Sequence, residues 1–147
     1  KEKWPKMTCF VDSNCSFPLW TEEKKEFVEI FDKVMIDIKG FTEEEHNLIT
    51  GTTNRTVIEN FRFLAGLDKV YEVRTVIMPE ITDNEKMVDN ISKLIAECNS
   101  DIKYKIIKFR QNGVREDVLK AYTPNDSYMN KLKRIALKNG LKDVVIV

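Results

Sequence analysis

The chain contains 147 residues, with 24 Lys and Arg, 24 Asp and Glu, and one His. Hydrophobic residues make up 42% and charged residues 33% of the sequence, which is typical of a globular protein with a buried core. The balanced charge provides no strong field to attract a nucleic acid, and no apolar run reaches the roughly 18 residues of a membrane span. We therefore expect no nucleic-acid partner and no membrane anchor.

Five short runs rich in β-branched and apolar residues indicate strands, and helical patterns separate them. The predicted strands are 7–12, 34–38, 71–78, 104–109 and 143–147. The predicted helices are 21–31, 42–51, 55–64, 84–98 and one that begins at Thr123-Pro124 and stops at Gly140. Runs 34–36 and 144–147 are almost continuously apolar, which predicts strands covered on both faces, as in a parallel sheet.

Local signals fix several of the expected helix ends. Thr42 with Glu45 is a capping-box pattern, and we expect the helix that it opens to end near Gly51. Gly66 is expected as the left-handed residue that follows the helix 55–64, and Pro124 is favoured at the first position of the last helix.

Two further patterns concern the surfaces of these helices. In the helix 21–31 we expect Phe27, Ile30 and Phe31 on one stripe. The run Glu43-Glu44-Glu45-His46 is expected to be a solvated helix start and not a metal site.

The element order is β-α-β-α-α-β-α-β-α-β, which predicts an α/β fold with right-handed crossovers and a parallel sheet. Five strands of this kind form either a doubly wound sheet or an arc of an incomplete barrel, and periodicity alone does not choose between them. Gly and Pro are scarce, with 5 and 4 residues, and no linker separates two halves. We expect one domain over residues 1–147.

The three cysteines bear on compartment and metal binding. Cys9, Cys15 and Cys98 are an odd number, and no secretion signal follows the charged start of the chain, so reduced thiols in the cytoplasm are predicted. Cys9 and Cys15 are too far apart for a zinc-binding pair, and His46 is the single histidine. We predict no metal ligands on this chain.

In a parallel sheet, ligands bind beyond the carboxyl ends of the strands. Asp12 and Asn14 follow the first strand, Asp37 and Lys39 end the second, and Arg74 lies inside the third. Each has a structural interpretation as well: Asp12 and Asn14 are common turn residues, and Asp37 with Lys39 could form an ion pair. A buried Arg74 needs an anionic partner, which is either a protein carboxylate or a ligand.

The motifs also occur in a specific order along the chain. Their residues are Asp12-Ser13-Asn14 and the segments 34–40, 46–51, 54–60, 73–84 and 109–115. This ordered series resembles the pyruvate formate-lyase-activating enzymes and their relatives in the radical S-adenosylmethionine superfamily. The resemblance extends over nearly the whole chain, and it implies the carboxyl-terminal portion of a partial (β/α) barrel similar to a TIM barrel.

The resemblance also implies an activity and a site. Enzymes of this family hold S-adenosylmethionine on a [4Fe–4S] cluster, take an electron from a donor and cleave the cofactor to a 5′-deoxyadenosyl radical, which abstracts hydrogen from a glycine of a partner glycyl radical enzyme. Asp12 and Asn14 match a segment that contacts the cofactor, whereas Asp37 and Lys39 match one near the cofactor and the substrate glycine loop. Arg74 matches an arginine that pairs with the methionine carboxylate.

Two departures from the family pattern limit what this chain can do alone. Cys15 stands where the family has a glycine, and the CxxxCxxC motif that binds the cluster is absent. The three cysteines cannot replace that motif, so the cluster is not expected on this chain. We therefore interpret the chain as a fragment of a radical S-adenosylmethionine oxidoreductase that is inactive by itself and contains no catalytic residue of its own.

An alternative of a different class is a non-catalytic homologue that has lost the cluster and serves as a protein-binding module. The two hypotheses differ at the first strand. If earlier strands of a barrel are missing, the edge near 7–12 should be open, and an open edge can pair with a second copy of the chain.

Overall fold

The computed structural model describes residues 3–111 and 121–147, which contain one five-stranded sheet. Its strands are β1 (Phe10–Ser13), β2 (Lys33–Asp37), β3 (Val70–Ile77), β4 (Lys103–Lys108) and β5 (Val144–Ile146). All four neighbouring pairs are parallel, and their order in the sheet is the order in the chain. The predicted parallel α/β fold is confirmed. The strand order lacks the reversal that defines a doubly wound sheet, and β1 and β5 form the two edges of an open arc.

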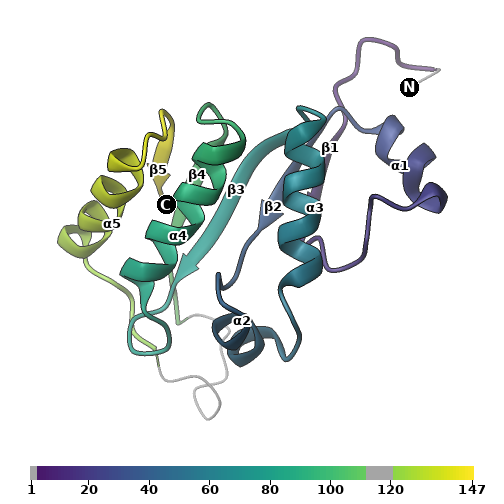
Figure 1. Cartoon of the computed structure of the whole chain (residues 1–147). Coiled ribbons are helices and arrows are strands. Elements are labelled where there is room, and N and C mark those ends of the chain that lie inside the picture. Colours follow the sequence, from purple (N-terminus) through teal and green to yellow (C-terminus); the bar gives the residue numbers. More distant parts are fainter. Residues whose placement is uncertain (1–2, 112–120) are drawn as a thin grey trace.

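Helices connect the strands, and they gather on one side of the sheet. They are the short 3₁₀ helix η1 (Glu22–Lys24) and the α-helices α1 (Lys25–Ile30), α2 (Glu43–Thr50), α3 (Arg55–Gly66), α4 (Asn84–Cys98) and α5 (Asp126–Lys138). Figure 1 shows α3, α4 and α5 side by side over one face, with α2 beyond the carboxyl end of β2. Within the described ranges, no helix covers the opposite face, and none is long and apolar enough to cross a bilayer.

The core lies between the sheet and its helices. The fully buried strand residues on this side include Val34, Ile36, Val73, Tyr104 and Ile106. Burial alternates along β2, with Val34 and Ile36 buried and Met35 half-buried between them. The expectation that this apolar run is covered on both faces is therefore wrong for the described part of the chain, and β2 is covered on one face only.

Several helix ends differ from the sequence prediction. α5 begins at Asp126 and not at Pro124, because the side chain of Asn125 accepts a hydrogen bond from the Tyr128 amide at 2.9 Å and caps the helix. Gly66 is the last residue of α3, and the left-handed conformation falls instead on Asp68, with φ 54°. The Gly51 cap is confirmed, with φ 74°.

The stripe predicted for the first helix is only partly formed: the rings of Phe27 and Phe31 are in contact, but only Phe31 is buried. Phe27 and Ile30 are 44% and 53% exposed, whereas Val28 and Phe31 are buried. The reason is local geometry: the segment opens with a 3₁₀ turn of three residues, and Phe31 is already extended, so the expected residues do not share one helical face.

Candidate functional site

The open face of the sheet, which no described helix covers, presents charged side chains in rows. Asp37 on β2, Arg74 on β3 and Lys105 on β4 are register partners, so their side chains leave the same face at the same level. One step toward the amino ends, Met35 pairs with Glu72. This arrangement brings a polar row to a face that a parallel sheet usually keeps apolar and covered.

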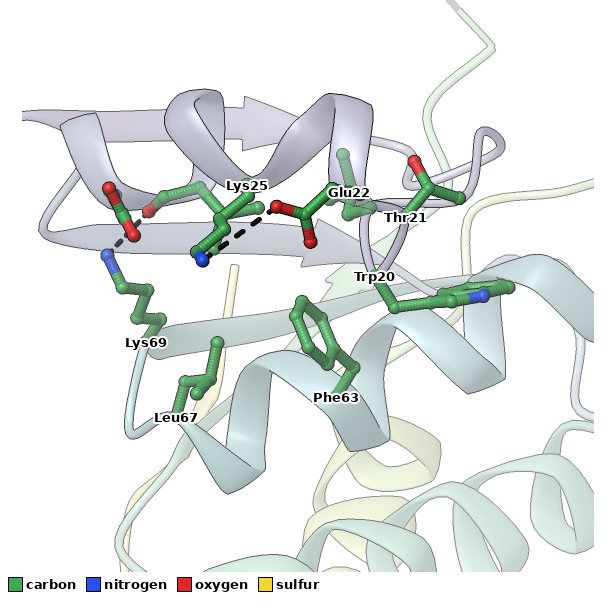
Figure 2. A pocket seen from close by; sticks show the side chains of 10 residues that line it. Trp20, Thr21, Glu22, Lys25, Phe63, Leu67 and Lys69 are labelled. Carbon is green, nitrogen blue, oxygen red and sulfur yellow. Dashed lines mark hydrogen bonds and ion pairs between the residues drawn. The ribbon is translucent and has the colours of Figure 1, made fainter.

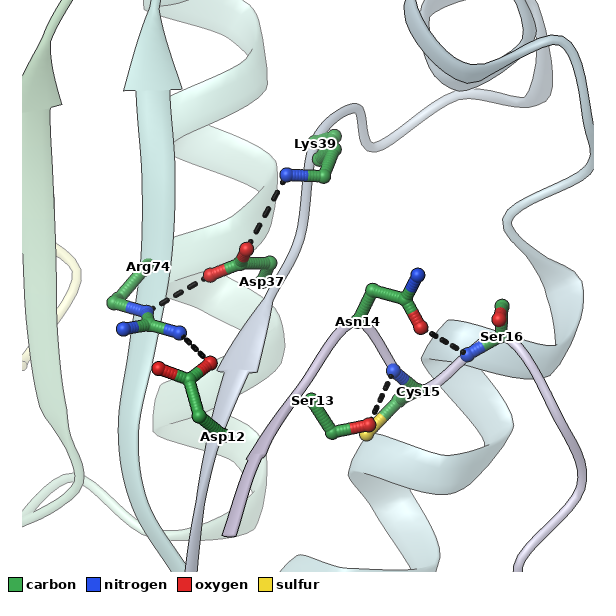
Figure 3. Close-up of polar contacts among 8 residues, drawn as sticks. All are labelled: Asp12, Ser13, Asn14, Cys15, Ser16, Asp37, Lys39 and Arg74. Atoms are coloured by element: carbon green, nitrogen blue, oxygen red, sulfur yellow. Dashed lines mark hydrogen bonds and ion pairs between the residues drawn. The ribbon is translucent and has the colours of Figure 1, made fainter.

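Arg74 is the centre of this face. Its Nε donates a hydrogen bond to Asp37 Oδ1 at 2.8 Å, and Nη2 donates to Asp12 Oδ1. Lys39 Nζ in turn donates to Asp37 Oδ2 at 3.2 Å. Figure 3 shows that the four side chains form one chain of contacts across β1, β2 and β3. The structure thus brings together four of the five residues that the sequence singled out.

The network is electrostatically matched and lies near the surface. The hydrogen bond from Arg74 lowers the pKa of Asp12, and the same bond raises the pKa of Arg74. The Arg74 side chain is 18% exposed and that of Asp12 is 58% exposed. Since ion pairs this close to solvent contribute about 0–1 kcal/mol each, the network does more to orient Arg74 than to stabilise the fold.

The Arg74 guanidinium has hydrogen-bond donors that the network does not use. Of its three nitrogens, Nε and Nη2 are used, and no residue in the described ranges accepts a hydrogen bond from Nη1. A planar guanidinium held by two carboxylates can therefore still bind a further carboxylate along its Nη1 edge. The carboxylates of Asp12 and Asp37 suit an ammonium group, so the arrangement fits a zwitterion such as the amino-acid part of S-adenosylmethionine.

Asn14 does not join this network. Its Oδ1 accepts a hydrogen bond from the Ser16 amide at 3.2 Å and closes a turn after β1, which is the structural interpretation that the sequence allowed. Cys15 follows with φ 52°, a left-handed conformation that favours glycine. The chain adopts this turn although a cysteine, and not a glycine, occupies the left-handed position. Burial raises the pKa of the Cys15 thiol to about 11.

Asn60 on α3 supports the loop after β1, a role that the sequence did not reveal. Its buried side-chain amide donates to the carbonyls of Cys15 at 2.8 Å and Phe17 at 2.7 Å, and its Oδ1 accepts from the Leu19 amide at 2.8 Å. All hydrogen-bonding positions but one are used, and each partner lies more than 40 residues away in sequence. The only available signal was its place at the end of the motif 54–60.

A second amide, Asn54, supports the loop after β2. Its Nδ2 donates to the carbonyls of Gly40, at 3.3 Å, and Phe41. Gly40 is needed here because a Cβ at this position would lie 2.5 Å from the backbone nitrogen of His46. Asn60 of α3 and Asn54, the residue before it, therefore hold the loops after β1 and β2, which contain Asn14 and Lys39.

His46 differs from the expectation of a solvated helix start. It is buried, and within the described residues its Nδ1 has no hydrogen-bond partner. Burial lowers the pKa of His46, and the nearby charge of Lys39 lowers it further. The sequence prediction failed because Glu43 and Glu44 are exposed, whereas the His46 side chain is buried and interacts with the backbone of Gly40.

The segment 109–115 is only partly described. Phe109 is buried in a small cluster with Met78 and Ala121, and Gln111 donates to the Ala121 carbonyl at 3.1 Å. Residues 112–115 lie outside the described residues, so this part of the motif series stays a prediction.

The thiols do not fit a [4Fe–4S] cluster. Over residues 3–111 and 121–147, no three His, Cys, Asp or Glu side chains gather as a metal site. Burial raises the pKa of Cys15 and of Cys98, which disfavours the thiolate form that ligates iron. Any cluster ligands would have to come from outside the described residues.

A hollow of about 390 Å³ lies elsewhere, between α1 and α3 (Figure 2). Trp20, Phe63 and Leu67 give it an apolar lining, and Lys25 and Glu22 form an ion pair of 3.8 Å at its rim. Lys69 donates to the carbonyls at the end of α1. None of the predicted site residues lines this hollow, so we place the candidate site on the open face of the sheet.

The fold and the site together define a class: an open parallel α/β sheet with a network of one arginine and two aspartates on its uncovered face. No family model matches the chain. Among curated proteins, the chain is 23% identical over 65% of its length to a pyruvate formate-lyase-activating enzyme of Streptococcus mutans. It is 25% identical over 85% of its length to the indoleacetate decarboxylase activating enzyme of Tractidigestivibacter scatoligenes. The chain spans 36% and 42% of these two relatives.

Solved structures show the same fold. A domain of a pyruvate-formate lyase-activating enzyme from Bacteroides vulgatus matches 99% of this chain and 84% of its own, with a TM-score of 0.77 and 16% identity. Streptococcus suis SuiB bound to S-adenosylmethionine matches 97% of this chain and 33% of its own, with a TM-score of 0.72 and 8% identity. The predicted resemblance is thus confirmed: the homologues of this chain are activating enzymes of glycyl-radical enzymes.

Proposed function

We propose that this chain supplies part of the S-adenosylmethionine site of a cytoplasmic radical S-adenosylmethionine enzyme that activates a glycyl radical enzyme. The observation that carries the proposal is Arg74, held between Asp12 and Asp37 with Nη1 left for a ligand. The names of the homologues and the S-adenosylmethionine-bound structure of similar fold support it.

Each residue of the network has a role in this proposal. Arg74 binds the methionine carboxylate, Asp12 and Asp37 orient Arg74 and face the ammonium group, and Lys39 fixes Asp37. Asn14 contributes through the turn that it closes. Bound S-adenosylmethionine supplies the hydrogen-abstracting chemistry that acts on a glycine of the partner protein, with an electron from an external donor. The cluster that this chemistry requires is held by residues outside those described.

One observation favours the alternative, a non-catalytic protein-binding module. Large apolar side chains are exposed around β1 and α1, and they include Trp4, Met7, Phe10, Phe17, Trp20, Phe27 and Ile30. β1 is an open edge of the sheet, however, which is what missing earlier strands of a barrel predict and not what the alternative predicts. The apolar patch suits another polypeptide segment, either from the same protein or from a partner. The alternative gives no reason for the arginine network.

Reading the coding DNA upstream of Lys1 separates the two. The proposal expects an in-frame CxxxCxxC, and the longer protein, reconstituted with iron and sulfide under anaerobic conditions, should cleave S-adenosylmethionine.

Arg74→Met should lower the rate of S-adenosylmethionine cleavage at least about tenfold, as loss of a charged contact to the ligand does. Lys131→Met on α5, far from the network, is the matched control and should change the rate less than about twofold. Equal rates for Arg74→Met and the unmodified protein would contradict the proposal.

The 147-residue chain alone should bind S-adenosylmethionine weakly, with a Kd of about 1 mM or more, because no cluster holds the ligand's amino and carboxylate groups. Calorimetry that gives micromolar binding without a cluster would contradict this division of the site.

A further inference from the structure

Lys105 stands next to Arg74 on the open face of the sheet. The two residues are register partners on β4 and β3, so their side chains start at the same level of the same face. The charge of Lys105 also reaches the network, because it contributes to lowering the pKa of Asp12. Lys105 is therefore part of the surroundings of Arg74, although no sequence motif pointed to it.

The partner of Lys105 is Glu72. The Lys105 Nζ lies 2.7 Å from Glu72 Oε1, but the contact lacks hydrogen-bond alignment, and Oε1 has no hydrogen-bond partner in the described part of the chain. The Glu72 side chain is only 3% exposed, whereas that of Lys105 is 28% exposed. The carboxylate is thus buried within the sheet, whereas the Lys105 side chain is partly exposed, and its ammonium has three donors, of which Glu72 occupies one side.

Stability does not account for this pair. Burying a carboxylate costs more than a single ion pair returns unless the geometry is good, and apolar side chains of similar size are often as stable in such places. A parallel sheet normally fills these positions with Val or Ile. Lys105 is the register partner of Arg74 on the open face, which suggests a role beside Arg74.

We propose that Lys105 is a second cationic ligand for the carboxylate bound at Arg74, and that Glu72 is its positioning residue. In this proposal, one oxygen of the ligand's carboxylate accepts a hydrogen bond from Arg74 Nη1, and the other accepts one from the Lys105 ammonium. The ion pair with Glu72 holds the Lys105 side chain in position beside Arg74. The inference rests on the proposed function, and it adds a residue that determines specificity for a carboxylate-bearing ligand.

The test is an NMR titration of the 147-residue chain with two probes, S-adenosylmethionine and its decarboxylated analogue, carried to about 20 mM so that a Kd of about 10 mM is still measured. Lys105→Met should weaken binding of S-adenosylmethionine about tenfold and leave the analogue within about twofold, because a charge-assisted hydrogen bond is lost only with the carboxylate. Lys103→Met, on the same strand and face, is the matched control and should change neither affinity. Lys105→Arg should retain most of the binding.

Glu72→Gln tests the positioning role. It should weaken S-adenosylmethionine binding several-fold, about threefold to fivefold, and the double variant with Lys105→Met should bind no more weakly than Lys105→Met alone. A Glu72 that is merely structural would weaken both probes alike and act additively.

The outcomes separate the two levels of the proposal. If Arg74→Met weakens binding of S-adenosylmethionine but Lys105→Met does not, the role of Lys105 is wrong and the proposed function stands. If Lys105→Met weakens both probes equally, the carboxylate contact is wrong. If S-adenosylmethionine shifts no resonance of Asp12, Arg74 or Lys105, both the inference and the proposed site are wrong.

Discussion

The two faces of the sheet differ in the side chains that they carry: apolar and buried on the helix side, charged and partly exposed on the open side. On β4, Ile106 points into the helix layer and is fully buried, whereas its neighbour Lys105 points to the open face and is partly exposed. The same alternation on β3 places Val73 in the core and Arg74 in the ion-pair network. The helix side supplies most of the apolar burial that stabilises the fold, whereas the ion pairs of the open side contribute little to stability and hold the charged groups in the positions that the proposed ligand site requires.

The largest expected effect compares neighbouring isoleucines on the two faces. Ile106→Ala should lower the free energy of unfolding by about 2–5 kcal/mol, because it leaves a cavity under the helices. Ile107→Ala, on the open face and half-buried, should cost about 1 kcal/mol. Urea unfolding of both variants measures the difference. Equal losses would mean that both faces are packed alike, and the comparison of the faces would fail.

Asn60 links the helix side to the site. Asn60→Ala removes a buried amide that makes three hydrogen bonds to the loop after β1, so we expect a loss of about 2–3 kcal/mol. Asn47→Ala, on the exposed side of α2, is the control and should stay within about 0.5 kcal/mol. Thermal unfolding with both variants checks this, and an unchanged Tm for Asn60→Ala would show that the loop does not depend on it.

The left-handed turn at Cys15 sets backbone strain against side-chain burial at a single residue. Cys15→Gly relieves a left-handed backbone worth about 1 kcal/mol but loses a small buried side chain, so the two effects should nearly cancel. Cys15→Val adds a methyl group at a buried position and cannot relieve φ 52°, and we expect it to lose more than about 1 kcal/mol. Chemical denaturation of the two variants decides, and a Val variant as stable as the Gly variant would rule out the backbone argument.

Burial of the Cys15 thiol also predicts how the stability of the fold depends on pH. The pKa of Cys15 is raised to about 11, so its contribution to stability is complete below the ordinary thiol value and is lost as pH rises toward 11. Its alkylation by iodoacetamide should accordingly be slow at pH 8. Fast modification of Cys15 in the folded chain would show that the thiol is not buried as described.

The stabilising contribution of His46 changes with pH in the opposite direction, because it is lost as the pH falls. Its pKa is lowered in the folded state, so its stabilising contribution is present above the ordinary histidine value, about 6.5, and is lost as pH falls through the lower folded value. The slope is at most about 1.4 kcal/mol per pH unit for one proton. The unfolding free energy of His46→Gln should vary less between pH 7 and 5, and an identical pH profile would contradict the assignment.

The smallest expected effect lies in the network itself. Lys39→Met breaks one partly exposed ion pair, the 3.2 Å contact with Asp37, and should change the unfolding free energy by no more than about 1 kcal/mol. A loss of several kcal/mol in urea unfolding would mean that the network stabilises the fold, and its interpretation as a ligand site would weaken.

The sequence predicted the sheet because apolar runs and turn residues are local signals. It also located Asp12, Asp37 and Lys39, since the carboxyl ends of parallel strands meet at one rim, and it located Arg74 as a charged residue inside an apolar strand that needs an anionic partner. Loop-to-helix contacts such as those of Asn60 were out of reach, because they join residues more than 40 positions apart. The partnership of Glu72 and Lys105 was likewise hidden, since it depends on the register of β3 against β4.

The most direct test of the open-face site is chemical-shift mapping of the 147-residue chain with millimolar S-adenosylmethionine. We predict that the perturbed amides cluster at the carboxyl ends of β1, β2 and β3, around Asp12, Asp37 and Arg74, and that Arg74→Met abolishes them. Perturbations that instead gather in the hollow between α1 and α3, or that persist in Arg74→Met, would contradict a ligand site on the open face.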